Sequence, residues 1–291
     1  MYPSRFSYEA ARSIDQAVQL LRDGGDEAKV LAGSQSLIPM MKLRFARPEL
    51  LVDINTIPGL DYHRADPDGT IHVGALCRHA DLERSELLAS RQPTMAAAAP
   101  VIADPIVRNR GTLVGSLCHA DPQGDWASVV LALGGSVVAH GPGGRRMIPA
   151  REFVLGPFEN ALAHDEIAVE AVIPAPNGTP AGGYLKLERR VGDFATVGVA
   201  VALETSGSTV TRAGIALTGV GGSTIEATAA EQALTGQPLT AETITEAARL
   251  AADAAQPKTD HRGSAAYKRH MVSTFVTRLL QARDGTQERA A

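Results

Sequence analysis

The segment that most constrains the fold is IPAPNGTPAGG, residues 173–183, which holds three prolines and three glycines in eleven positions. Proline cannot donate a backbone hydrogen bond, and glycine loses more conformational freedom on ordering than any other residue. We therefore expect neither a helix nor a sheet ladder here, and we place a domain boundary in this segment. With 291 residues the chain exceeds the usual size of one compact domain, so a division into residues 1–175 and 176–291 is expected.

The apolar patterns differ on the two sides of this boundary. Before it, helix-like and strand-like segments alternate, beginning with a helix that runs from Ser13 to Gly24 and has Gln16 at capping-box spacing. After it, strand-like segments come first and helices follow. The predicted helices span about residues 226–234, 241–254 and 264–282. This order predicts an α+β arrangement whose sheet is covered by helices on one face.

Charge and composition argue against several classes of partner. The formal net charge is only -4, and no basic tract of the kind that follows a nucleic acid backbone is present. The first residues, MYPSRFSYEAARS, contain no apolar core of signal-peptide length, and no apolar run approaches the ~18 residues of a membrane span. We therefore expect a cytoplasmic protein that binds neither nucleic acid nor membrane.

Two glycine-containing segments each follow an apolar run and precede a predicted helix. The first is AGSQS, residues 32–36, and the second lies in GTLVGSLCHADPQGDW, residues 111–126. Glycine lets backbone N–H groups turn toward an anion and lets the anion approach closely. Neither segment matches the Walker pattern GxxxxGK[ST] or the dinucleotide fingerprint GxGxxG. Neutral donors lie in both segments: Ser34, Gln35, Ser36, Thr112 and Ser116.

Three interpretations of these segments remain open on residue chemistry alone. The first is a metal site, but Cys118 and His119 are adjacent, so their side chains diverge, and neither begins a CxxC or HxxxH pair. The second is a glycine-rich turn with a buried thiol. The third is a cradle for a diphosphate held from both sides. Cys77 and Cys118 are too few for a four-cysteine iron–sulfur site, so any such chemistry must come from another chain.

Four longer segments resemble one known family in order and in content. They are AGSQSLIPMMKLR, VRNRGTLVGSLCHADPQGDWASVVLALG, DEI followed by VIP, and YLKLERRVGDFATVGVA. The chain resembles the FAD-binding medium subunits of molybdenum hydroxylases, the group that contains carbon monoxide dehydrogenase and the flavin part of xanthine dehydrogenase. The resemblance implies a two-lobed FAD-binding domain of the vanillyl-alcohol-oxidase (PCMH) type, with lobes at about residues 1–55 and 56–175. A smaller α+β domain, an antiparallel sheet plus a helical bundle, is expected over residues 176–291.

The resemblance also implies a set of FAD-binding residues. Both glycine segments are expected to hold the diphosphate, and Asp125 to accept a hydrogen bond from a ribityl or ribose hydroxyl, although Asp125 also suits a helix N-cap. Lys186 is expected beside the flavin ring or, alternatively, as a solvated strand lysine; His119 lies near the cofactor or caps a turn. The full expected set is Leu31, Ala32, Gly33, Ser34, Gln35, Ser36, Leu37, Ile102, Ala103, Gly111, Thr112, Val114, Gly115, Ser116, His119, Asp125, Ile167, Ala168, Lys186 and Phe194.

Three positions depart from the family pattern. Ser34 stands where relatives commonly have the second glycine of AGGQS or AGGHS, and Val114 stands at a glycine of TIGGS. If either position needs a positive φ angle, a β-branched valine there is strained. Phe194 replaces a tyrosine common among close relatives, so its ring has no hydroxyl to donate a hydrogen bond.

The resemblance implies an electron-transfer role rather than acid–base catalysis, and we expect no catalytic residue on this chain. The expected partners are a large molybdopterin-binding subunit and a small subunit with two [2Fe–2S] clusters, assembled as a dimer of heterotrimers. FAD on this chain then passes electrons to an external acceptor. Two alternatives are a stand-alone FAD-dependent oxidoreductase and a non-catalytic subunit that has lost FAD.

Overall fold

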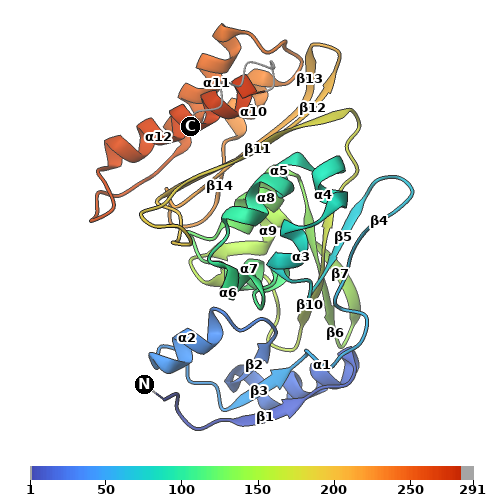
Figure 1. The fold of residues 1–291 in the computed structure, drawn as a ribbon. Coiled ribbons are helices and arrows are strands. Elements are labelled where there is room, and N and C mark those ends of the chain that lie inside the picture. The colour runs from blue at the N-terminus through green and yellow to red at the C-terminus, as the bar shows by residue number, and fades with distance from the viewer. Residues whose placement is uncertain (1, 283–291) are drawn as a thin grey trace.

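The computed structural model describes residues 2–282 and arranges them in three stacked parts (Figure 1). The first part, here called the first lobe, is a small parallel sheet with strand order β1-β3-β2 and two helices. Its elements are β1 (Ser7–Ala10), α1 (Ile14–Gly24), β2 (Ala28–Leu31), α2 (Leu37–Lys42) and β3 (Leu50–Asp53). Strand β2 runs directly into the first glycine segment, so the sheet fixes where that segment begins.

The start of helix α1 was predicted correctly. The Ser13 hydroxyl accepts a hydrogen bond from the Gln16 backbone at 3.1 Å, and the Gln16 side chain accepts one from the Arg12 backbone at 2.8 Å. The bond to Ser13 satisfies an N–H group that has no partner inside the helix, while the Gln16 side chain bonds to the residue before the N-cap instead of closing a capping box. The predicted stop is one residue early, because Gly24 is still helical and Gly25, with a φ of 55°, forms the C-cap.

The second lobe consists of a five-stranded sheet covered by helices. Its strand order is β4-β5-β10-β6-β7, with all neighbours antiparallel, and a two-stranded ribbon lies beside it. The strands are β4 (His63–Ala65), β5 (Ile71–Gly74), β6 (Ser136–Gly141), β7 (Gly144–Pro149), β8 (Val154–Gly156), β9 (Glu159–Asn160) and β10 (Ile167–Ile173). The helices are α3 (His79–Glu83), α4 (Glu86–Arg91), α5 (Pro93–Ala98), α6 (Pro105–Arg108), α7 (Leu113–His119), α8 (Asp125–Ala132) and α9 (Ala150–Phe153).

The third part is an antiparallel four-stranded sheet followed by three helices, as expected for the C-terminal domain (Figure 1). Its strands are β11 (Thr179–Leu187), β12 (Val197–Ser206), β13 (Thr209–Thr218) and β14 (Ile225–Glu226). Its helices are α10 (Thr228–Leu234), α11 (Ala241–Ala254) and α12 (Ala265–Gln281). The α+β class and the predicted order of strands and then helices are thereby confirmed. Among residues 2–282, no helix combines the length and the apolar character needed to cross a membrane.

The prediction that residues 173–183 form no ladder was wrong for Ile173, which ends β10 and pairs with Ile71, and for the second half of the segment. Residues 179–183 begin strand β11, where Pro180 is paired with Glu204 and Gly182 with Ala202. Strand β11 is an edge strand, and an edge is where a sheet tolerates a residue that cannot donate a hydrogen bond. Gly182 has a φ of 126°, and a Cβ atom there would lie 2.0 Å from the Val201 carbonyl oxygen. Glycine is therefore required by a close backbone approach inside the sheet.

The expectation that the C-terminal sheet is covered on one face was also wrong, because both faces are buried. Along β12, Val199 and Val201 face a core formed with helices α10–α12, whereas Ala200 and Ala202 belong to the core of the second lobe. Neighbouring side chains of a strand point to opposite faces, so the two cores share the strand. Helices α5 and α8 of the second lobe cover the second face. Small residues on that face let the helices pack closely.

Replacement of Gly214 by alanine tests this close packing. A Cβ atom on Gly214 of β13 would lie 1.8 Å from the carbonyl oxygen of Ala132 in α8, so backbone must move. Overpacking of this kind costs about 2 kcal/mol or more, and we expect the Gly214→Ala chain to unfold at clearly lower temperature and urea concentration. Gly222→Ala is the matched control, because a Cβ there meets no atom within 4 Å. Equal stability of the two variants would contradict the packing described here.

Candidate functional site

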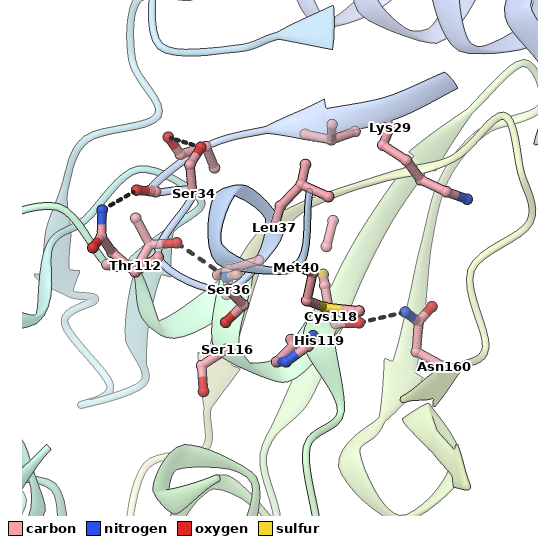
Figure 2. A pocket seen from close by; sticks show the side chains of 18 of the residues that line it. Lys29, Ser34, Ser36, Leu37, Met40, Thr112, Ser116, Cys118, His119 and Asn160 are labelled. Carbon is pink, nitrogen blue, oxygen red and sulfur yellow. Dashed lines mark hydrogen bonds between the residues drawn. The ribbon is translucent and has the colours of Figure 1, made fainter. Parts of the chain in front are cut away.

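A pocket of about 730 Å³ lies between the two lobes. Its walls come from β2 and α2 of the first lobe, from α7 and β10 of the second lobe, and from the loop that joins β11 to β12. Figure 2 shows this pocket, with Ser34 and Ser36 of the first glycine segment and Thr112 and Ser116 of the second among its lining side chains. Segments that are far apart in sequence therefore meet at one site.

The two glycine segments touch through their backbones. A Cβ atom on Gly33 would lie 2.3 Å from the carbonyl oxygen of Arg110 and 2.8 Å from the Cα atom of Gly111. Any side chain at residue 33 would push the two segments apart. On the second segment, a Cβ on Gly111 would lie 2.8 Å from the His79 ring. Glycine at residue 33 lets the two segments approach each other, and glycine at residue 111 lets the second segment pack on His79.

The two departures from the family pattern in these segments have different structural consequences. Ser34 has a φ of 63°, in the left-handed region that favours glycine, so the first segment carries local strain. The Ser34 hydroxyl donates a hydrogen bond to the Ala32 carbonyl oxygen at 3.4 Å. Val114 lies within helix α7 and is not among the residues with positive φ, so the valine is not strained. Helix α7 begins with Thr112 as its N-cap, whose Oγ1 atom accepts a hydrogen bond from the Gly115 N–H at 3.0 Å.

Asp125 does not act as the N-cap of helix α8. Gly124 holds that position, and Asp125 is the first helical residue. The Asp125 carboxylate instead accepts hydrogen bonds from the Tyr184 hydroxyl at 2.6 Å and from Lys186 Nζ at 3.1 Å. Burial raises the pKa of the Asp125 carboxyl, and the bonds from Lys186 and Tyr184 oppose this effect. The C-terminal sheet therefore supplies the counter-charge of a buried acid that lines the pocket.

Lys186 is not a solvated strand lysine, because its side chain is only 2% exposed. Its ammonium group donates to Asp125 and to the Val101 carbonyl oxygen at 3.1 Å, and it lies 3.4 Å from a carboxylate oxygen of Glu188. Two of its N–H groups are thus hydrogen-bonded to oxygens of the chain, whereas Glu188 contributes an ion pair without a hydrogen bond. Lys186 contacts the pocket only through Asp125, since its own side chain does not line the pocket.

All of the predicted site residues except Leu31 and Lys186 line this pocket. Leu31 is the last residue of β2, and its carbonyl oxygen accepts a hydrogen bond from the Ile54 N–H at 3.1 Å. His119 lines the pocket with its ring centroid 5.2 Å from that of Phe158, and burial lowers the pKa of the imidazole. Phe194 lies at the β11–β12 loop with half of its surface exposed. The structure thus gathers residues from five separate segments, which no local pattern predicts.

Several pocket residues were missed by the sequence analysis, among them Cys118, Asn160 and His79. Burial raises the pKa of the Cys118 thiol to about 12, so the thiol stays protonated at neutral pH. Asn160, from β9, donates a hydrogen bond to the Cys118 carbonyl oxygen at 2.7 Å (Figure 2). Within the described part of the chain, no group of three histidine, cysteine or acidic side chains is arranged to hold a metal ion.

His79 is a buried histidine whose tautomer is set by one neighbour. The Trp126 indole N–H donates to His79 Nδ1 at 3.0 Å, so a neutral ring carries its proton on Nε2. Burial, assisted by Arg108 and Arg78, lowers the pKa of the imidazole to about 4. His79 also packs beneath Gly111, which places it directly behind the second glycine segment. The sequence around His79, an HAD tripeptide in a helical pattern, does not predict that His79 supports the second glycine segment.

The pKa of His79 predicts an acid-sensitive contribution to stability. An unfolded histidine has a pKa of about 6.5, so the unfolded chain binds a proton at higher pH than the folded chain does. The contribution of neutral His79 is therefore complete above about pH 6.5 and is lost as the pH falls toward 4. The shift corresponds to about 3 kcal/mol. We expect His79→Asn, which keeps an acceptor for Trp126, to lose correspondingly less stability over this interval. Urea unfolding at several pH values measures the difference, and parallel pH profiles of the two chains would refute it.

Comparisons with known proteins identify the family and the fold. Residues 4–176 match the family described as FAD binding domain in molybdopterin dehydrogenase, and residues 183–282 match the CO dehydrogenase flavoprotein C-terminal domain. The chain is 42% identical to the carbon monoxide dehydrogenase medium chain of Hydrogenophaga pseudoflava, over 97% of this chain and 98% of that one. It is 40% identical to subunit alpha of the 6-hydroxypseudooxynicotine dehydrogenase complex of Paenarthrobacter nicotinovorans, over 96% and 95% of the two chains.

Solved structures give the same result at the level of the fold. A chain of carbon monoxide dehydrogenase from Hydrogenophaga pseudoflava, in a form that lacks the Mo-pyranopterin moiety, superposes with a TM-score of 0.93 at 44% identity. That match covers 98% of this chain and 99% of the other. A chain of quinoline 2-oxidoreductase from Pseudomonas putida 86 superposes with a TM-score of 0.89 at 30% identity, over 98% and 99% of the two chains. The chain therefore belongs to the family of FAD-binding medium subunits of molybdenum hydroxylases, which includes the carbon monoxide dehydrogenase medium chains.

Proposed function

We propose that this chain holds FAD in the pocket between its lobes and transfers electrons within a molybdenum hydroxylase complex. It receives them from [2Fe–2S] clusters of a small partner subunit, while a large molybdopterin-binding partner hydroxylates the substrate. The observation that supports this function most directly is the backbone contact between Gly33 and Arg110–Gly111, which brings two segments rich in neutral donors to one wall of a long pocket.

The residues around this contact suit a dinucleotide diphosphate. The hydroxyls of Ser36 and Ser116 and the amide of Gln35 belong to residues that line the pocket there, and all of them are uncharged donors. Backbone N–H groups of glycine segments can bind phosphate oxygens without interference from a Cβ atom. These segments would hold the diphosphate of FAD, and Asp125 is placed to accept a hydrogen bond from a sugar or ribityl hydroxyl.

The loop between β11 and β12 would contact the flavin ring. Gly192, Asp193 and Phe194 line the pocket, and Gly192 has a φ of 89° that turns the loop toward Ala103. Arg262 donates a hydrogen bond to the Phe194 carbonyl oxygen at 3.1 Å and so restrains the loop. The Phe194 ring can cover one face of the isoalloxazine but cannot donate a hydrogen bond to it. Bound FAD accepts electrons singly and releases them in pairs, and this chain supplies its orientation and electrostatic surroundings.

Exposed apolar side chains near the pocket support the proposed assembly with partner subunits. Phe158 and Phe194 line the pocket and are half exposed, and Phe45, Ile106 and Val191 are exposed neighbours of lining residues. Large apolar side chains grouped around one site commonly mark a protein–protein interface. A partner that covers this rim would exclude water from the cofactor. We propose the two expected partners, arranged as a dimer of heterotrimers, as the proteins that cover it.

The FAD content of Gly33→Ala tests the proposed site. We expect the wild-type chain, purified with its partner chains, to show flavin absorption at about 450 nm, because bound isoalloxazine carries its own chromophore. Gly33→Ala should lose most of this FAD, since its Cβ atom separates the two glycine segments. Gly143→Ala is the matched control, because a Cβ there meets no atom within 4 Å.

The same preparation separates the proposed function from the two alternatives. A wild-type complex without flavin, even after incubation with FAD, would favour a subunit that has lost the cofactor. Turnover of a small substrate by the chain without partners would favour a stand-alone oxidoreductase. An unchanged flavin content in Gly33→Ala would contradict the assignment of the glycine segments to the diphosphate.

A further inference from the structure

Behind the two glycine segments, one polar side chain from each lobe links them. Asn55 follows β3 of the first lobe, and its Nδ2 atom donates a hydrogen bond to the Ala32 carbonyl oxygen at 2.9 Å. Arg78 is the N-cap of α3 in the second lobe, and its Nη1 atom donates to the Arg110 carbonyl oxygen at 2.8 Å. The other guanidinium nitrogen, Nη2, donates to Asn55 Oδ1 at 2.7 Å. One continuous chain of hydrogen bonds therefore joins the two backbones.

The two carbonyl groups at the ends of this series of hydrogen bonds are those of Ala32 and Arg110. They belong to the peptide units that precede the Cα atoms of Gly33 and Gly111. Because a trans peptide unit is planar, its N–H points away from its C=O. The bond from Asn55 to Ala32 therefore directs the Gly33 N–H away from Asn55. The bond from Arg78 likewise fixes the Arg110 carbonyl, whose oxygen is the atom that approaches Gly33 most closely. Side chains that lie outside the pocket thus set the orientation and the spacing of the two segments.

Asn55 is itself held rigidly. Its Nδ2 atom and its backbone N–H both donate to Asp53 Oδ1, at 2.6 Å and 2.8 Å. The other oxygen of Asp53 accepts a hydrogen bond from the Tyr8 hydroxyl at 2.6 Å, so the anchor extends to the outer strand β1. Arg78 is anchored through its backbone N–H, which donates to Asp81 at 3.1 Å. Each end of the link is therefore attached to the framework of its own lobe.

The first glycine segment needs such support, because Ser34 has a left-handed backbone conformation, which is unfavourable for a residue with a side chain. A strained backbone persists only where surrounding contacts hold it in place. Neither Asn55 nor Arg78 lines the pocket, so any effect on a ligand must act through the two segments. The planar guanidinium group suits this role, because it bonds two acceptors at a fixed angle.

We propose that Asn55 and Arg78 form an interlobe latch, which sets the separation of the two glycine segments and thereby the affinity for the diphosphate of FAD. This inference rests on the proposed function and assigns positioning residues that do not touch the cofactor. Through the latch, both lobes together determine the geometry of the diphosphate site. Its loss lets the two segments separate while the rest of the pocket lining stays in place.

A double-mutant cycle on the complex purified with its partner chains tests the latch. FAD is removed, and rebinding is followed by quenching of flavin fluorescence for the wild type, Asn55→Ala, Arg78→Ala and the double variant. We expect each single change to weaken FAD binding about tenfold or more, because each removes a hydrogen bond that involves a charged group or its partner. The double variant should bind no more weakly than Arg78→Ala, because the bonds act as one unit. Arg84→Ala, an exposed arginine at the end of α3, is the matched control and should bind FAD like the wild type.

Competition by ADP and AMP distinguishes positioning from a general loss of structure. The latch predicts that ADP, which carries a diphosphate, loses affinity by about the same factor as FAD, while AMP does not. Arg78→Lys keeps the charge but cannot bond both acceptors in the same geometry, so it should restore binding only in part. This variant also carries the test if Arg78→Ala does not fold. A lower melting temperature with unchanged FAD affinity, or additive losses in the double variant, would overturn the latch.

The outcomes also separate the latch from the function on which it rests. A wild-type complex that binds neither FAD nor ADP would overturn both. A wild-type complex that binds FAD, with latch variants that bind it equally well, would overturn the latch alone.

Discussion

The site depends on one contact between backbones, that of Gly33 with Arg110 and Gly111. Each lobe contributes one glycine segment, and neither segment alone encloses a ligand. The segments approach so closely that a single Cβ atom would fill the space between them. The sheets of the two lobes bring the segments to this point, and the pocket begins where they meet. The fold can therefore form this site only because residue 33 has no side chain.

The glycine segments could be predicted from sequence because their chemistry is local. Glycine, serine and threonine at short spacing after an apolar run indicate a backbone that can face an anion, and the order of four longer segments indicated the family. The start of α1, with Ser13 as the N-cap that accepts from the Gln16 backbone, was predictable for the same reason. The details still differ from the prediction. The sequence indicated possible backbone strain at both Ser34 and Val114, whereas only Ser34 has a positive φ angle.

The rest could not be predicted because it depends on which distant residues meet. Asn55 and Arg78 look like ordinary polar residues near the end of a strand and the start of a helix. His79 and Trp126 are far apart in sequence, and their hydrogen bond exists only in the folded chain. The second covered face of the C-terminal sheet was missed because the expectation counted only the helices that follow its strands in sequence, whereas α5 and α8 precede them. Ala200 and Ala202 lie on that face. Small residues there indicate close packing against α8.

The salt bridge between Asp125 and Lys186 joins the two family-level units across their interface. The acid belongs to the wall of the pocket, whereas the base and the tyrosine that pairs with it arrive on strand β11. Removal of the C-terminal unit would take both the Lys186 ammonium group and the Tyr184 hydroxyl away from the Asp125 carboxyl group. A C-terminal unit exchanged into this chain would therefore have to bring equivalent donors to the same place to keep these contacts.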